Sequence, residues 1–224
     1  MPTPPLAILD NLEHLPDPFR LSPQEVAPQL SKREQQLDYY YALRYLVSYK
    51  GSSATFNAYR REVERILQWL WQIHGGSLQD IRREHIEQFM DFCISPPNNW
   101  IGIKNVARFK TRQGMRLANN EWRPFVCKYD KATGMQAAIS AYRPSQKAIQ
   151  SSFAILSSFF NFLIQEEFIS ANPVALVRQK SRFIQFLFHY WVSLLGIFIP
   201  TINFLIVWLC GKLSVHPYPS AGPI

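Results

Sequence analysis

The chain has 224 residues, of which 47% are hydrophobic, so it is long enough for one domain with a buried core. Its net charge of +8 favours a polyanionic partner, namely DNA, RNA or an anionic membrane face. Three distant cysteines without a CxxC pair and five scattered histidines exclude a disulfide framework and a zinc site, so no metal and no cofactor are expected.

The N-terminal segment, residues 1–31, is rich in proline and acidic residues and lacks periodicity, which predicts an extended arm. It has no basic start followed by an apolar run, so no signal peptide is predicted and the expected location is cytoplasmic. A first helix is predicted at about 32–49, with a cluster of tyrosines that favours core packing over base stacking. Lys50-Gly51-Ser52-Ser53 then interrupts the chain, with serine as the next helix cap.

A second helix is predicted at about 54–74, because its apolar residues recur at helical spacing and form one stripe. Gly75-Gly76 ends it, and a shorter helix follows at about 80–93. The stripe of the second helix consists of Phe56, Tyr59, Val63, Ile66, Leu67 and Leu70.

A long irregular segment at about 95–143 separates this helical part from a fourth helix that starts near Pro144. The segment is basic and contains tryptophan and phenylalanine, so parts of it are expected to pack. The fourth helix has one apolar face and one face of serine, glutamine and asparagine. Asn172-Pro173 then predicts a cap and the first turn of a short basic helix at 174–182.

Three groups of residues are candidates for contact with nucleic acid, although each could also be solvated surface. Near the start of the second helix, hydroxyl, amide and guanidinium groups suit phosphate oxygens. The basic cluster of the irregular segment favours DNA contact over a solvated loop, and the early turns of the fourth helix allow close approach to DNA. The candidates in the first two groups are Thr55, Asn57, Arg60, Arg61, Lys104, Arg108, Lys110, Arg112 and Arg116.

The helix ATFNAYRREVERILQWL at 54–70 and the segment 145–177, which ends in ISANPVALV, resemble in this order the N-terminal core-binding domain of tyrosine recombinases, the phage integrase and Xer-type family. The resemblance covers about residues 35–182. It implies an all-α fold, a compact SAM-like bundle of four to five helices at 32–182 that clamps one face of duplex DNA. In the family, the helix at 54–70 meets the DNA backbone and the fourth helix crosses the major groove. The resemblance therefore implies that Lys147, Gln150 and Ser151, on the early turns of the fourth helix, are further contact candidates.

The family's catalytic residues belong to a C-terminal domain and include a His-x-x-Arg pair and a nucleophilic tyrosine. No His-x-x-Arg occurs in this sequence. The expectation is therefore a non-catalytic, DNA-binding fragment of a site-specific recombinase, which would act in DNA integration and recombination with a full-length recombinase as partner.

Residues 183–224 form an apolar tail, and 183–210 contain no Asp, Glu, Lys or Arg. That stretch is long enough to cross a bilayer as an apolar C-terminal helix. Two interpretations stay open: a transmembrane segment with the preceding domain in the cytoplasm, or an out-of-frame end. The alternative function is a membrane-anchored helical adaptor whose basic face meets anionic lipid or a protein partner.

Overall fold

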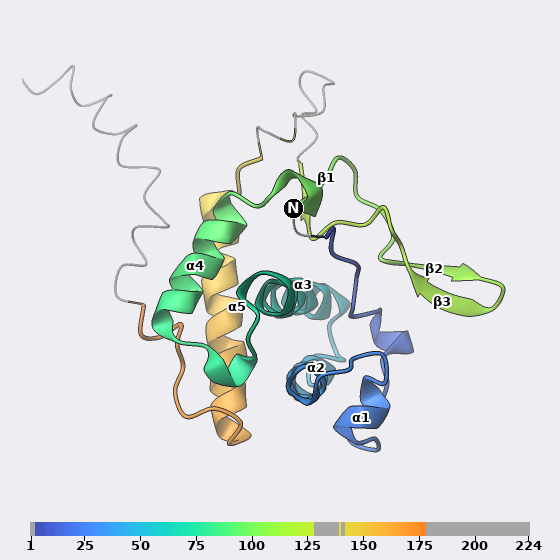
Figure 1. Cartoon of the computed structure of the whole chain (residues 1–224), viewed down its shortest axis with the longest axis horizontal. Helices are drawn as coiled ribbons and strands as arrows, with labels where there is room; N and C mark the ends of the chain where they lie inside the picture. The colour runs from blue at the N-terminus through green and yellow to red at the C-terminus, as the bar shows by residue number, and fades with distance from the viewer. Residues whose placement is uncertain (1–2, 128–138, 140–141, 178–224) are drawn as a thin grey trace, which may run out of the picture. The chain divides into compact units, whose positions relative to one another are not determined.

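The computed structural model describes residues 3–127, 139 and 142–177, all of which belong to one compact unit, Met1–Ile184 (Figure 1). The predicted transmembrane segment at 183–210 lies outside the described residues.

Within the described residues, four long helices confirm the helices predicted from the periodicity of apolar residues. They are α2 (Arg33–Val47), α3 (Ser53–Trp69), α4 (Arg83–Ile94) and α5 (Gln146–Gln165). Two short helical turns precede α2, namely η1 (Leu12–His14) and α1 (Pro23–Val26). Three others follow α3 or α4: η2 (Leu70–His74), η3 (Leu78–Asp80) and η4 (Asn98–Trp100).

The ends of α3 follow from local chemistry. The Ser52 hydroxyl accepts a hydrogen bond from the backbone N–H of Thr55, which satisfies one of the free donors at the helix start. After one π-helical turn, Gly75 has a φ of 83°, a left-handed conformation that glycine adopts without strain. The predicted cap and stop are thus confirmed.

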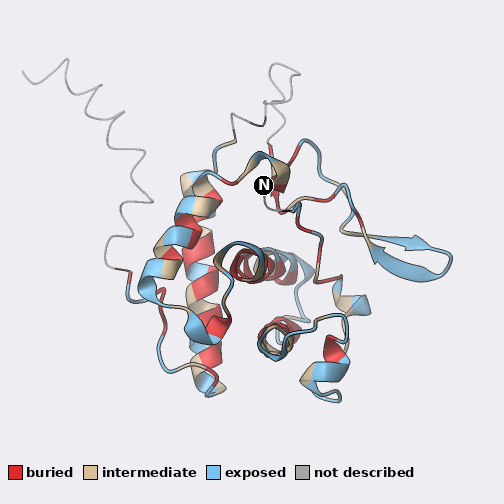
Figure 2. Ribbon diagram, viewed as in Figure 1, coloured by how far each residue is buried: buried red, intermediate tan, exposed pale blue. Residues whose placement is uncertain are grey.

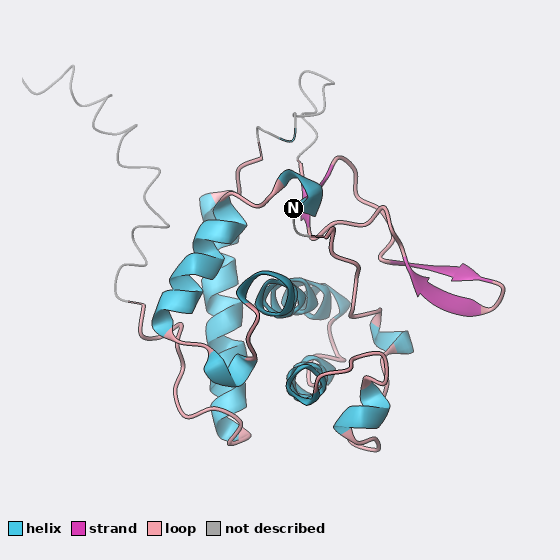
Figure 3. Cartoon of the chain, viewed as in Figure 1, coloured by secondary structure: helices cyan, strands magenta, loops and turns pink. Residues whose placement is uncertain are grey.

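The prediction of an all-α fold is wrong, because the described part of the segment between α4 and α5 contains two small sheets (Figure 3). Strands β1 (Ile101–Gly102) and β4 (Phe125–Val126) pair in parallel. Strands β2 (Phe109–Arg112) and β3 (Met115–Ala118) form an antiparallel hairpin. Its two-residue turn, Gln113-Gly114, has φ values of 50° and 78°, the backbone that matches hairpin twist. Strands of two to four residues are too short to give a periodic sequence signal.

The core lies where α5 packs against α2 and α3. Leu156, Phe159, Phe160 and Leu163 of α5 are buried. In Figure 2 much of α5 is red, the colour of buried residues. The Tyr45 ring lies 5.1 Å from the Phe159 ring, so the predicted core role of the tyrosine cluster is confirmed for this residue.

The segment between α4 and α5 also packs onto the helices. Trp100 and Phe125 are fully buried. The Phe92 ring of α4 lies 4.9 Å from the Trp100 ring and 6.0 Å from the Phe125 ring, both edge-on. The expectation that parts of this segment pack is confirmed.

Residues 6–11 of the N-terminal arm are fixed across α3. Leu9 is fully buried, and the backbone N–H groups of Ile8 and Leu9 donate to the Glu64 carboxylate at 2.6 and 3.0 Å. The Gln68 amide donates to the Leu6 carbonyl at 2.7 Å. These three hydrogen bonds hold the arm on α3 and place Asp10 and Asn11 beside Arg60.

At the end of the described chain, the Asn172 side chain caps a turn. Its Oδ1 accepts from the backbone N–H groups of Val174 and Ala175 at 2.9 and 3.2 Å. Pro173 to Leu176 form a turn, and the remainder of the predicted helix at 174–182 lies outside the described residues from 178 onward.

Candidate nucleic-acid interface

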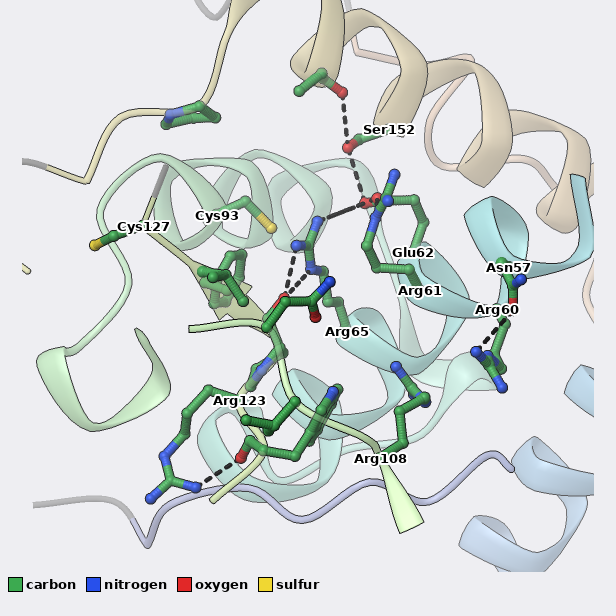
Figure 4. Close-up of a pocket in the computed structure, with 18 of the residues that line it drawn as sticks. Asn57, Arg60, Arg61, Glu62, Arg65, Cys93, Arg108, Arg123, Cys127 and Ser152 are labelled. Carbon is green, nitrogen blue, oxygen red and sulfur yellow. Dashed lines mark hydrogen bonds and ion pairs between the residues drawn. The ribbon is translucent and has the colours of Figure 1, made fainter. Parts of the chain in front are cut away.

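Arginine side chains from α3, from the segment after α4 and from the approach to α5 line one cleft of about 990 Å³ (Figure 4). Two carboxylates, those of Asp10 and Glu62, line it as well. The cleft is therefore strongly positive overall. Its seven arginines are Arg60, Arg61, Arg65, Arg108, Arg116, Arg123 and Arg143.

Arg60 is buried in this cleft although the sequence placed it off the apolar stripe of α3. Its Nη1 donates to the Asp10 carbonyl at 2.7 Å and to Asn11 Oδ1 at 2.9 Å, and its Nη2 donates to Asn57 Oδ1 at 2.8 Å. These three acceptors are neutral, and Arg60 Nε has no partner among the described residues. Burial lowers the pKa of Arg60 to about 10, which leaves the guanidinium charged at neutral pH and suited to an anion.

Arg116 and Arg108 fix the N-terminal arm. The Arg116 guanidinium donates two hydrogen bonds to the Asp10 carboxylate, of 2.9 and 2.6 Å. Burial acts to raise the pKa of Asp10, but hydrogen bonds from Arg116 and from the Asn11 backbone outweigh it, so this pKa lies below its usual value. Arg108 donates to the Leu9 carbonyl at 3.2 Å and forms an ion pair with Glu64.

Glu62 of α3 is buried, and its carboxylate joins α3 to α5. It accepts from Arg61 Nε at 2.8 Å, from Arg65 Nη1 at 3.1 Å and from the Ser152 hydroxyl of α5 at 2.8 Å. Burial acts to raise the pKa of Glu62, but the charges of Arg65 and Arg61 lower it below its ordinary value. Arg65 also donates to the Pro124 carbonyl at 3.0 and 2.7 Å, which ties the segment before β4 to α3.

The cleft brings together five of the twelve predicted contact residues: Asn57, Arg60, Arg61, Arg108 and Arg116. Thr55 lies in the first turn of α3, and its hydroxyl is 2.9 Å from the Ser52 hydroxyl. On the first turns of α5, Lys147 and Gln150 are exposed and Ser151 is half-buried, outside the lining of the cleft. The others, Lys104, Lys110 and Arg112, are exposed and lie in or before the β2–β3 hairpin.

Three arginines of the cleft, Arg65, Arg123 and Arg143, are not among the predicted contact residues, and neither is Asp10. Arg65 follows Arg61 by four residues, so helical spacing alone places both on one side of α3. Asp10 gives no such signal, because its position depends on the docking of the arm.

Among the described residues, no group of three or more His, Cys, Asp or Glu side chains could hold a metal ion. Cys93 and Cys127 are both buried. Within the same part of the chain, α5 is long and apolar enough to cross a membrane, but its buried face belongs to the core described above. Core helices often meet this criterion, so the property is weak evidence for a membrane segment.

Residues 41–97 match the family model described as phage integrase, N-terminal SAM-like domain. The match runs from the second half of α2 through α3 and α4 and stops just before η4. Comparisons with curated proteins and with solved structures find no match.

Proposed function

We propose that this chain, which carries a phage integrase N-terminal SAM-like domain at residues 41–97, binds duplex DNA through the arginine cleft as the non-catalytic module of a site-specific tyrosine recombinase. The matched domain is the non-catalytic one of its family. A full-length recombinase would then supply the catalytic residues for DNA integration and recombination, and the protein would work in the cytoplasm, where DNA is accessible.

The observation that carries the proposal is the composition of the cleft, seven arginines against two carboxylates. Guanidinium groups bind phosphate oxygens in bidentate geometry and with charge-assisted hydrogen bonds. Arg60 adds to this positive charge, since its three hydrogen-bond acceptors are neutral and the Asp10 carboxylate is the nearby acidic group that acts on it. A DNA phosphate would supply the missing negative charge.

The starts of two helices border the same cleft. Asn57 belongs to the second turn of α3, while Ser145 caps α5 and Ala148 lies in its first turn. Free N–H groups at a helix start favour phosphate. We expect a DNA sugar–phosphate backbone bound at the cleft to continue past Thr55 at the start of α3. On the other side it would continue past Lys147, Gln150 and Ser151 at the start of α5.

The test is salt-dependent binding of the full chain to a labelled duplex, measured by fluorescence anisotropy. The phosphate contacts of the cleft carry no sequence preference, and such contacts alone are expected to give a dissociation constant on the order of 1 to 100 micromolar at physiological salt. Arg61→Ala should weaken binding to all duplexes alike and reduce the slope of log affinity against log salt by about one.

Arg83→Ala is a matched control. Arg83 lies outside the cleft, its side chain is 48% exposed against 49% for Arg61, and each pairs with a glutamate. We expect Arg83→Ala to bind as the unmodified chain does. Affinity that did not change with salt, or binding to anionic vesicles but not to duplex, would refute the proposal, and the second result would favour the membrane-anchored adaptor.

A further inference from the structure

The β2–β3 hairpin stands out from the packed helices in Figure 1, and most of its surface is exposed in Figure 2. We propose that this hairpin is a ribbon that enters the major groove of duplex DNA and contacts base edges. The inference rests on the proposed function, but it assigns to the hairpin a role separate from the phosphate contacts of the arginine cleft.

The pairing of the strands sorts the side chains of the hairpin onto two faces. Lys110 pairs with Leu117 and Arg112 pairs with Met115. Because side chains alternate along a strand and paired residues share a face, these four lie together. All four are exposed, Met115 at 59% and Leu117 at 47%. This face, here called the outer face, thus repeats a cation beside an apolar side chain.

The opposite face anchors the hairpin. Arg116 reaches back to Asp10 of the N-terminal arm, and its Nη1 lies 3.4 Å from the Thr111 hydroxyl. At the base, Asn119 donates from its backbone to the Arg108 carbonyl at 2.8 Å and from its side chain to the Ala107 carbonyl at 2.7 Å. These hydrogen bonds fix the base of the hairpin and turn its Arg116 face toward the N-terminal arm, so the outer face points away from the arm.

The dimensions of the hairpin fit the major groove. Four residues per strand span about 13 Å, and the two strands lie about 4.8 Å apart. The major groove of B-DNA is about 12 Å wide and admits a two-stranded ribbon, whereas the minor groove, at about 6 Å, is too narrow once side chains are added. The deep, narrow major groove of A-form RNA excludes such a ribbon.

The chemistry of the outer face also fits base edges. Lysine and arginine bind the O6 and N7 acceptors of guanine, and apolar side chains contact the thymine methyl group. Strands β2 and β3 contain no acidic residue. Glu121 lies 3.8 Å from Lys110, with both side chains more than half exposed, and such a pair exchanges easily for a DNA contact.

Modified duplexes test the groove directly with the full chain. Replacing guanine by 7-deazaguanine removes the N7 acceptor from the major groove, and replacing thymine by deoxyuridine removes the methyl group. We expect both to weaken binding. Replacing guanine by inosine changes only the minor-groove amino group and should have no effect. If inosine weakened binding and the other two replacements did not, the assignment to the major groove would be overturned.

Variants then connect the groove to the hairpin. Lys110→Ala with Arg112→Ala should lower affinity about fivefold to a hundredfold and abolish the effect of 7-deazaguanine. Met115→Ala with Leu117→Ala should abolish the discrimination between thymine and deoxyuridine. Two double variants serve as controls: Arg82→Ala with Arg83→Ala removes two exposed cations of the α4 start, and Ile73→Ala with Leu6→Ala removes two exposed apolar side chains. Both should bind as the unmodified chain.

The outcomes separate the two proposals, provided that thermal melting shows every variant folded. Hairpin variants that bind like the unmodified chain, while Arg61→Ala remains impaired, would overturn the ribbon and leave the DNA-binding module. An unmodified chain that binds no duplex would overturn both. Hairpin variants that lost binding to anionic vesicles but kept their affinity for duplex would assign the outer face to lipid and overturn the ribbon.

Discussion

The four long helices and the segment from η4 to β4 both bury aromatic side chains, but different interactions fix their backbones. In α3 and α5 the main-chain hydrogen bonds are internal, and a serine hydroxyl caps each start. In the second region, distant groups hold the backbone: Arg65 of α3 binds the Pro124 carbonyl, and the Cys127 N–H donates to the Gly102 carbonyl. The helices thus form their main-chain hydrogen bonds locally, whereas the segment from η4 to β4 is also held by the Arg65 side chain of α3.

The largest effect is expected in the helical core. Phe160→Ala should lower the free energy of unfolding by about 3–5 kcal/mol, because the ring is fully buried and its loss leaves a cavity. Phe153→Ala, at a site that is 5% exposed, should cost a similar amount. Leu117→Ala on the hairpin is the control and should leave the urea unfolding curve unchanged. Equal curves for all three variants would mean that α5 is not a core helix.

The next effect concerns the charges that join the two regions. Glu62→Gln should destabilise the fold by about 3 kcal/mol at neutral pH, because Arg65 loses its buried counter-charge. The exposed Glu84→Gln is the control. Urea unfolding followed by tryptophan fluorescence measures both. If the two variants were equally stable, the β region would not depend on this ion pair.

The same variant has a defined pH dependence. The pKa of Glu62 in the folded protein lies below its value in the unfolded chain, which is about 4.3. Its contribution to stability is therefore complete above that unfolded pKa and is lost as pH falls through the folded pKa. The gap in unfolding free energy between the unmodified chain and Glu62→Gln should be widest near pH 7 and should close in acid. A gap that stayed constant down to pH 3 would contradict this assignment.

The smallest effect is expected at the N-terminal arm. Asp10→Asn should lower stability by about 1–2 kcal/mol, since Arg116 loses a charge-assisted pair. Under the proposed function it should also strengthen duplex binding, because the Asp10 carboxylate no longer competes with phosphate for Arg116. Calorimetric melting and fluorescence anisotropy measure the two changes. Asp17→Asn, in an exposed pair with Arg20, is the control and should change neither.

The sequence by itself determined the helices and the orientation of α3. Phe56, Val63, Ile66 and Leu67 recur at helical spacing and are all buried, and the cap at Ser52 acts within three residues. Such signals are local, because a helix forms its hydrogen bonds between residues four apart. The same periodicity placed Arg61 on the open side of α3, where its side chain is half exposed.

Only the tertiary structure decided how the cleft is completed. Arg60 is buried because the arm returns across α3 from some 50 positions earlier in the chain. Strand β1 pairs with β4, with Ile101 opposite Phe125, across a gap that includes the whole hairpin. These contacts join residues that lie far apart in the sequence, as the ion pair of Arg116 with Asp10 does. Such contacts produce no periodic pattern in the sequence around either residue. The spacing of residues specified each helix, and the docking of the arm and the hairpin set which arginines remain open to a ligand.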